Sequence, residues 1–249
     1  MRYVIRKNRL SPETDSKDEL LTRKAEAAYL GLAIGDALGA TVEFMLPNEI
    51  KHQYGIHDKI IGGGWLHLKP GQVTDDTTMA LALGESILEN RRFEQIDMAQ
   101  AFDRWLKGKP VDVGNTVRRG IIHYRLSGDP CSPVNEFDAG NGACMRVLPV
   151  ALATLNETEP EIARICRMQS HVTHNNPVSD AAVDCVVEMI HMGLRGESLE
   201  QMANGPVERL IADNPRFDYR KKPHKNPSAY IVDTIRVVFQ ALFITDSFE

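Results

Sequence analysis

The sequence predicts an all-α fold arranged as a single domain, and two observations support this. Apolar residues recur at intervals of three and four positions along most of the chain, whereas alternation of apolar and polar residues is scarce. The segments between these stretches are rich in glycine and proline, as in IIGGGWLHLKPGQ and LSGDPCSPVNEFDAGNG, which is typical of irregular connections. Because no internal repeat and no low-complexity linker interrupts the pattern, we expect no domain boundary inside it.

The apolar spacing marks the expected helices in order along the chain. Ala80, Leu83 and Ile87 share one face, and Phe102 and Leu106 share another. The charged start of the chain, residues 1–21, lacks the apolar core of a signal peptide, so we expect a loosely held arm followed by a folded domain over residues 22–249. Helices are predicted within that domain at residues 22–41, 77–90, 95–107, 114–125, 142–154, 160–168, 179–193, 198–213 and 228–243.

Composition and charge exclude several classes of function. The chain has 249 residues, 43% of them hydrophobic and 25% charged, and a net charge of −5, so no basic field attracts nucleic acid. The apolar segment AAYLGLAIGDALGA is too short for a membrane span and contains Asp36. Four cysteines without a CxxC pair indicate reduced thiols in a cytoplasmic protein rather than a zinc or disulfide framework: Cys131, Cys144, Cys166 and Cys185.

The first expected helix carries three glycines at intervals of four residues. Gly31, Gly35 and Gly39 clear one face of side chains, which lets another helix approach closely. Glycine costs roughly 1 kcal/mol relative to alanine inside a helix, so three on one face indicate a packing or functional requirement. Asp36 lies among them, and an acid at a close contact needs a partner.

Asp75 and Asp76 stand next to each other in VTDDTTMALAL, where an apolar helix begins. An acid and Thr74 at this place make a good N-terminal cap, which the helix dipole favours. One acid is enough for that role, and the second adds repulsion unless a cation lies nearby. Hydroxyl and carboxylate oxygens are ligands for Mg²⁺, Mn²⁺ or Ca²⁺, so both a cap and a metal site remain open.

Other polar clusters are candidates for chemistry, although each also has a common structural explanation. The loop Gly140–Gly142 can present N–H groups to a phosphate, or can be a simple turn and cap. His171 and His174 flank SHVTH, where a hydrogen-bonded structural histidine is the commoner role. Tyr230 opens the last helix and would ordinarily be a core residue with a satisfied hydroxyl. No P-loop, dinucleotide or HExxH motif is present.

Five segments in this order resemble the ADP-ribosylglycohydrolase family: GLAIGDALGATVEF, VTDDTTMALAL, PVDVGNT, GNGACMR and VTHNNPVSDAA. The segments QYGIH, IGGGWLHLKPGQ and AYIVDT are similar to the branch of that family that acts on dinitrogenase reductase in nitrogen-fixing bacteria. The resemblance runs from about residue 24 to the C-terminus. Five motifs in register are far more specific than any one of them.

The resemblance implies an orthogonally packed multi-helix domain that holds two Mn²⁺ or Mg²⁺ ions in a cleft and removes ADP-ribose from a protein arginine. It implies metal ligands at Thr74, Asp75 and Asp76, and catalytic acids at Asp112 and Glu43. The residues that it places around ADP-ribose are Asn115, Gly140, Asn141, Gly142, Met145, His174 and Tyr230. As partners it implies an ADP-ribosylated protein, namely dinitrogenase reductase, and a PII signalling protein, with the chain itself a monomer.

The sequence departs from the family pattern at its C-terminal end. Family members continue into a GGDxDT-type motif whose acids and threonine complete the metal pair, so we expect this chain to be truncated and its second ion site to be incomplete. A smaller departure is Thr78, where close relatives tend to carry an acid. Two alternatives therefore stay open: an ADP-ribose-binding protein without catalysis, and the same chemistry on another ADP-ribosylated target.

Overall fold

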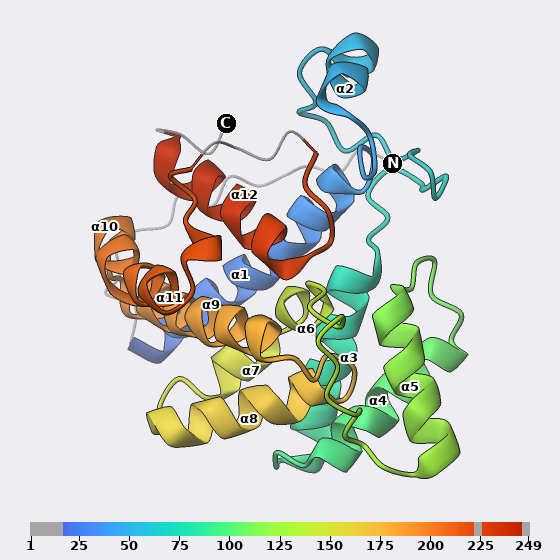
Figure 1. Cartoon of the computed structure of the whole chain (residues 1–249), viewed down its shortest axis with the longest axis vertical. Coiled ribbons are helices and arrows are strands. Elements are labelled where there is room, and N and C mark those ends of the chain that lie inside the picture. Colours follow the sequence, from blue (N-terminus) through green and yellow to red (C-terminus); the bar gives the residue numbers. More distant parts are fainter. Residues whose placement is uncertain (1–16, 222–225, 246–249) are drawn as a thin grey trace, which may run out of the picture.

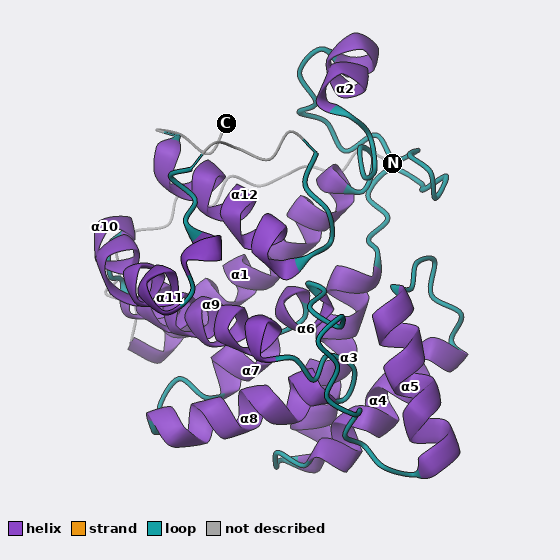
Figure 2. Ribbon diagram, in the orientation of Figure 1, coloured by secondary structure: helices purple, strands orange, loops and turns teal. Residues whose placement is uncertain are grey.

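The computed structural model describes residues 17–221 and 226–245, and within these ranges every regular element is a helix (Figure 2). The prediction of an all-α fold is therefore confirmed. In chain order the elements are α1 (Lys17–Gly39), α2 (Pro47–Tyr54), α3 (Asp75–Asn90), α4 (Gln95–Lys107), α5 (Asn115–Ser127), α6 (Gly142–Met145), α7 (Leu148–Ala153), α8 (Glu159–His171), α9 (Pro177–Arg195), α10 (Leu199–Met202), the π segment η1 (Ala203–Val207), α11 (Glu208–Asp213), the 3₁₀ turn η2 (Pro215–Phe217) and α12 (Ile231–Ile244).

Most predicted helices are present, and the misses have identifiable causes. The helix expected at 142–154 is two short helices, α6 and α7, because Pro149 cannot donate the backbone hydrogen bond that a continuous helix needs. The helix expected at 198–213 is interrupted by η1, which contains Pro206. Helix α2 was not predicted, since it buries no residue and so has no apolar stripe. Helix α1 begins at Lys17, inside the expected arm, whose residues 1–16 lie outside the described part.

Helix α9 joins two apolar clusters that together make the core (Figure 1). On one side Val183 and Val187 pack with residues of α3, α4, α5, α7 and α8. On the other side Cys185 and Met189 pack with residues of α11 and α12. The core thus forms around helix α9. The loop that precedes this helix contains His174, Asn175 and Asn176, which are described below.

The glycine face of α1 does not serve the close helix contact that its spacing predicted. A Cβ atom built on Gly31, Gly35 or Gly39 would meet no described atom within 4 Å. The face is exposed, together with Leu30 and Ile34 of the same helix. The expectation of close packing there is wrong for the described residues, whereas the expectation that Asp36 has a partner is confirmed below.

A lobe made of α2 and the loops on either side of it, residues 40–74, stands out from the helical body (Figure 1). Its loops are shaped by glycines with positive φ, including the consecutive Gly62, Gly63 and Gly64. No helix in the described residues has both the length and the apolar character needed to cross a membrane. All of the cysteines, which fall within these ranges, are free thiols, as expected from their spacing.

Candidate active site

The N-terminus of α3 is capped by a residue from another helix, Asp36 of α1. Its carboxylate accepts hydrogen bonds from the backbone N–H of Thr74 at 2.9 Å and of Thr77 at 3.2 Å. It also accepts from both threonine hydroxyls, at 2.8 Å and 2.6 Å. One side chain thus satisfies donors that the first turn of a helix leaves free. Asp75 and Asp76 are not needed as caps.

These two adjacent acids are left with charges that no cation neutralises at short range. Burial, followed by the charge of Asp112, raises the pKa of Asp75 to about 6. Burial, followed by the charges of Asp75 and Asp36, raises the pKa of Asp76 to about 7. Within residues 17–221 and 226–245, neither carboxylate has an ion pair within 4 Å. Such uncompensated acids are typical of sites that bind a cation or carry out proton transfer.

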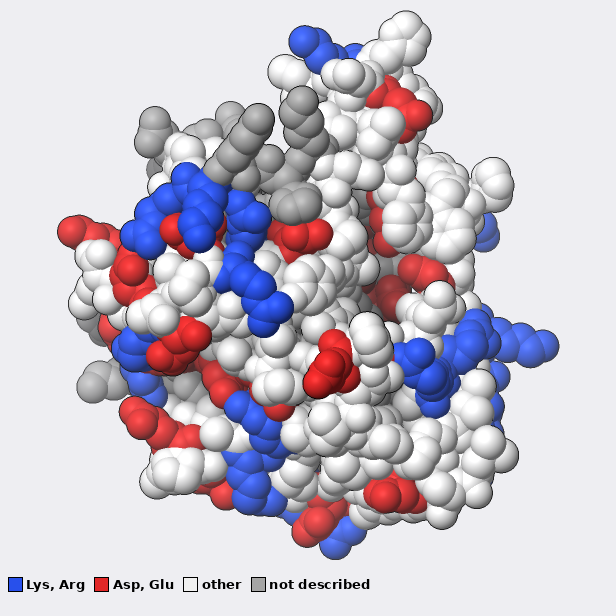
Figure 3. Space-filling view, viewed as in Figure 1, with Lys and Arg blue, Asp and Glu red and all other residues white. Residues whose placement is uncertain are grey.

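Two further acids from separate loops come near the same turn. The charge of Asp112 acts on both Asp75 and Glu43, and the backbone N–H of Gly114 donates to Asp75. Burial is the main cause of the raised pKa of Glu43. Trp65 holds its carboxylate, with Nε1 donating to Oε2 at 2.9 Å. The structure therefore brings together the expected catalytic acids and the expected metal ligands, and Figure 3 shows acidic atoms inside a hollow below the α2 lobe.

The chemistry of this turn fits a hard divalent cation. Thr74 gives its hydroxyl proton to Asp36, which leaves the lone pairs of Oγ1 available, and the carboxylates of Asp75 and Asp76 are free of capping and of ion pairs. All three are oxygen donors, which Mg²⁺ and Mn²⁺ prefer. In the described part of the chain, no three side chains among histidine, cysteine, aspartate and glutamate converge as metal ligands. The turn thus supplies part of a ligand set.

Backbone hydrogen bonds join the loop Gly140–Gly142 to the start of α12, and we call this connection the joint. Gly140 and Tyr230 are paired as an antiparallel bridge. Asn141 donates its backbone N–H to Ala229 O at 3.0 Å, and Ile231 donates to Ala139 O at 2.9 Å. Two segments that are about 90 residues apart in the sequence are fixed together, as the predicted ADP-ribose site requires.

His174 lies beneath this loop rather than on its exposed side. The side chain is 2% exposed, and a Cβ on Gly142 would lie 2.6 Å from its Cε1, so only glycine allows the loop to rest on the ring. Thr173 Oγ1 is 2.8 Å from His174 Nδ1 and also accepts from Arg146. Burial, followed by the charges of Arg146 and Arg119, lowers the pKa of His174 to about 3, so the ring is neutral.

Arg146, which the sequence analysis did not single out, is buried between the acidic turn and His174. Its guanidinium donates to Gln169 and Thr173 and lies 4.2 Å from the centre of the Phe102 ring. Burial lowers its pKa to about 9, while the charge of Asp75 opposes this shift. The signal in the sequence was an arginine inside the apolar run MRVLPVAL. Its positive charge offsets part of the negative charge of the turn.

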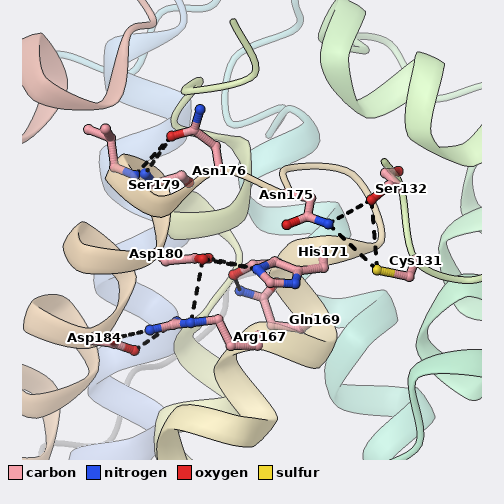
Figure 4. Close-up of polar contacts among 12 residues, drawn as sticks. Cys131, Ser132, Arg167, Gln169, His171, Asn175, Asn176, Ser179, Asp180 and Asp184 are labelled. Atoms are coloured by element: carbon pink, nitrogen blue, oxygen red, sulfur yellow. Dashed lines mark hydrogen bonds and ion pairs between the residues drawn. The ribbon is translucent and has the colours of Figure 1, made fainter. Parts of the chain in front are cut away.

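The motif VTHNNPVSDAA builds the support for these loops (Figure 4). Asn176 Oδ1 accepts from the backbone N–H groups at the start of α9 and so caps this helix. Its Nδ2 donates to Asn135 O at 2.9 Å. Asn175 Nδ2 donates to Ser132 O at 2.8 Å. Both asparagines thereby hold the segment that ends at Gly140. His171 is paired with Asp180 at 3.0 Å, so this histidine has a structural role as the simpler explanation predicted.

The remaining predicted site residues lie at the edges of the same region. Asn115 is exposed at the first position of α5, three residues after Asp112. Met145 ends α6 and packs against the core. The hydroxyl of Tyr230 accepts from Arg216 Nη1 at 3.2 Å, a neighbour that the sequence analysis missed because it lies in the separate turn η2. Thr78 accepts from Trp105 Nε1 at 2.9 Å and donates to Thr74 O at 2.8 Å, so it supports the acidic turn.

Comparison with known protein families and sequences gives one consistent result. The family model described as ADP-ribosylglycohydrolase matches residues 17–241. The chain is 48% identical over 230 residues to ADP-ribosyl-[dinitrogen reductase] glycohydrolase of Rhodospirillum rubrum, with 91% of this chain and 76% of that protein covered. It is 32% identical to ADP-ribosylarginine hydrolase Tri1 of Serratia proteamaculans, with 96% of this chain covered but only 66% of that protein.

A solved structure agrees with the sequence matches. The chain superposes on a structure titled ADP-ribosylglycohydrolase-related protein complex with a TM-score of 0.78 and 29% sequence identity. The superposition covers 93% of this chain and 78% of the other. Fold, motif order and sequence identity therefore point to the same group of proteins.

Proposed function

Because the chain belongs to the ADP-ribosylglycohydrolase family, a family of hydrolases, we propose that it removes ADP-ribose from a modified arginine of a protein, with dinitrogenase reductase as the target. Two relatives carry names that refer to ADP-ribosyl-[dinitrogen reductase] and to ADP-ribosylarginine, which supports an arginine-linked substrate.

The observation that carries this proposal is the state of the acids at the start of α3. Asp36 takes over the capping role, so Asp75 and Asp76 remain as oxygen donors that form no ion pair with any described residue. Glu43 and Asp112 stand close enough to interact with them electrostatically. A structural explanation of the TDDT motif does not need this concentration of negative charge, which is unfavourable without a cationic guest.

Thr74, Asp75 and Asp76 would hold one Mn²⁺ or Mg²⁺ ion. The described residues contain no group of three or more histidine, cysteine, aspartate or glutamate side chains placed to hold a metal ion. When bound, such an ion would supply positive charge beside the ribose hydroxyls and the attacking water. Arg146, buried behind the turn, moderates the repulsion between the acids in the absence of the ion.

In the proposed reaction, water adds to C1 of the ribose while the bond from C1 to the arginine nitrogen breaks and its electron pair stays on that nitrogen. A carboxylate accepts a proton from the water, and the released guanidine gains one, so the charge balances. Asp112 and Glu43 are the candidates for this transfer. The raised pKa of Glu43 brings it nearer to neutral pH, where a group can both accept and give up a proton.

The ADP-ribose moiety would be oriented by the joint between Gly140–Gly142 and Tyr230. Backbone N–H groups at the start of α6 and the Asn115 side chain are donors of the kind that pyrophosphate oxygens accept. His174, neutral beneath the loop, keeps it in place without adding charge.

The substitution Asp112→Asn tests the proposal directly. Release of ADP-ribose from an arginine-modified protein, measured with Mn²⁺ present, should fall by about 10²- to 10⁴-fold because proton transfer is lost. Binding of free ADP-ribose, measured by calorimetry, should stay within about twofold of the wild type. Unchanged turnover would remove Asp112 from the mechanism.

A second candidate function is ADP-ribose binding without hydrolysis. It is favoured by the finding that, among the described residues, no three side chains of the histidine, cysteine, aspartate and glutamate types come together as ligands of a metal ion. Titration of Mn²⁺ into the 249-residue chain, followed by the release assay, separates the two functions. Tight ADP-ribose binding with no release at saturating Mn²⁺ would establish the binding function.

A further inference from the structure

The α2 lobe contains a groove that the proposed reaction has not yet used. Its volume is about 710 Å³, and it is lined by residues of the segment 43–54 together with Gly64 and Trp65. Glu43, the expected catalytic acid, lies on its wall, so the groove adjoins the place where the glycosidic bond would be cut.

Two aromatic rings stand exposed beside that acid. Phe44 is 74% exposed and Trp65 is 49% exposed, and their ring centres are 5.4 Å apart in an edge-to-face arrangement. Trp65 also donates to the Glu43 carboxylate at 2.9 Å. Large rings are ordinarily buried, so a pair that is exposed and tied to a charged group indicates a binding surface.

The backbone is shaped to keep this arrangement. Gly64 has φ of 65°, and a Cβ there would lie 2.7 Å from Ala40 O, so only glycine lets the turn carrying Trp65 press against the end of α1. Phe44 has φ of 62°, which is unfavourable for a residue with a side chain. Strained positions of this kind cluster at ligand-binding sites.

The charged residues that line the groove favour a positively charged ligand. The lining of the groove contains the carboxylates of Glu43 and Glu49 but no lysine or arginine. Glu49 accepts from the Leu46 backbone N–H at 2.6 Å and so belongs to the N-terminus of α2, whereas Glu43 accepts from Trp65 and lies beside the two rings. The lining also carries the polar side chains of Asn48, His52, Gln53 and Tyr54. Next to Glu43 the groove offers aromatic faces and edges beside a carboxylate, a combination that binds planar cations such as a guanidinium.

We propose that this groove binds the arginine side of the substrate, with the guanidinium lying against Phe44 and Trp65 and facing Glu43. This inference rests on the proposed function and deepens it, because it assigns the part of the site that distinguishes arginine-linked ADP-ribose from other linkages. The neutral side chain of an ADP-ribosylated serine offers these rings no charge. The α2 lobe then gives the preference for arginine-linked over serine-linked ADP-ribose, whereas the loops of the helical body bind the ADP-ribose part itself.

The test compares two substrates in four variants: Phe44→Leu, Trp65→Phe, Trp65→Ala and Leu126→Ala. Leu126 is 84% exposed on α5 and serves as the control for removal of an exposed apolar side chain. For each variant, kcat and KM are measured with an arginine-modified protein and with an ADP-ribosylated serine peptide. Calorimetry with free ADP-ribose, and thermal unfolding, report whether the rest of the site and the fold are intact.

We expect Trp65→Ala to raise KM for the arginine-linked substrate by about tenfold and Phe44→Leu by about threefold, with free ADP-ribose binding unchanged. Trp65→Phe keeps a ring but loses the hydrogen bond to Glu43, so its effect should fall mainly on kcat. Leu126→Ala should match the wild type on both substrates.

Equal losses on both substrates, or no loss in Trp65→Ala, would overturn the inference while leaving the proposed function intact. A wild-type protein that releases ADP-ribose only from serine, or from neither substrate, would overturn both. If Trp65→Ala unfolds, Phe44→Leu and Trp65→Phe decide the question, since both keep an apolar side chain in place.

Discussion

Two helices of this protein, α3 and α9, each carry two acidic residues in their N-terminal part, but the surroundings of these acids differ. Helix α3 has Asp75 and Asp76 in its first turn, and α9 has Asp180 in its first turn and Asp184 one turn later. Both N-termini are capped by another residue, Asp36 for α3 and Asn176 for α9. In neither case do the acids serve as the cap.

The difference lies in the cations around them. In α9, Arg167 forms ion pairs with both acids, and His171 lies 3.0 Å from Asp180. Around the acids of α3, the described residues place no cation within ion-pair distance. Burial raises the pKa of Asp184 as well as those of Asp75 and Asp76, but among these three only Asp184 has an arginine, Arg167, whose hydrogen bond and charge oppose the shift. A pair of acids at a helix N-terminus is therefore not by itself a sign of function. The missing counter-charge is the informative feature, since it leaves room for a cation from outside the chain.

The largest test of this comparison exchanges one acid in each helix for its neutral isostere. Asp75→Asn should weaken Mn²⁺ binding and lower turnover by more than about a hundredfold, because it removes a ligand. Asp184→Asn should leave turnover within about twofold and cost about 1 kcal/mol of stability, since the side chain is partly exposed to solvent. Calorimetry, the release assay and urea unfolding measure these effects. Similar activity losses in both variants would abolish the distinction.

A second test removes the cap of α3. Asp36→Ala leaves two N–H groups and two hydroxyls of the first turn without their acceptor, so we expect a loss of about 2 kcal/mol in the free energy of unfolding. The affinity for Mn²⁺ should fall with it, because the turn that presents the ligands loosens. Glu85→Ala, which changes an exposed acid of the same helix, is the control and should stay within about 0.5 kcal/mol.

If Asp36→Ala and Glu85→Ala are equally stable, Asp36 does not cap α3 in solution. Retention of full Mn²⁺ affinity in a destabilised Asp36→Ala protein would show that the ligands do not depend on the cap. Either result would weaken the argument that Asp75 and Asp76 are free for metal binding.

The last test concerns the histidines near α9 and changes stability only at acidic pH. His171 is paired with Asp180, whereas no described carboxylate is paired with His174. Burial lowers the pKa of His174 from 6.5 to about 3. In the unfolded chain His174 binds a proton near pH 6.5, whereas in the folded chain it stays neutral down to about pH 3. The free energy of unfolding therefore has its full value above pH 6.5 and decreases as the pH falls toward 3. Between pH 6.5 and 5 this loss amounts to about 2 kcal/mol. In His174→Gln that part of the pH dependence should disappear from urea unfolding curves; an unchanged profile would mean that the ring is accessible to protons.

Much of the fold was predictable because it follows from local spacing. The helix predicted at 95–107 has those bounds in the structure, and those predicted at 77–90 and 179–193 extend by about two residues at most. The close helix contact predicted from the glycine face of α1 is absent among the described residues, because glycine spacing shows that a close contact is possible but not that a partner is present. Pro149 and Pro206 mark the places where the helices predicted at 142–154 and 198–213 are interrupted. The apolar periodicity that continues across both prolines nevertheless favoured uninterrupted helices.

The chain sequence by itself determined the helical class, the order of the motifs and the types of oxygen donor that could meet a divalent cation. Only the tertiary structure decided which acids are free, since capping by Asp36 and pairing by Arg167 join residues that sequence distance separates. It also decided that His174 supports the Gly140–Gly142 loop from below and that Trp65 stands beside Glu43. The physical reason is that the charge state and role of an acid depend on what surrounds it, and those surroundings are assembled only when the helices pack.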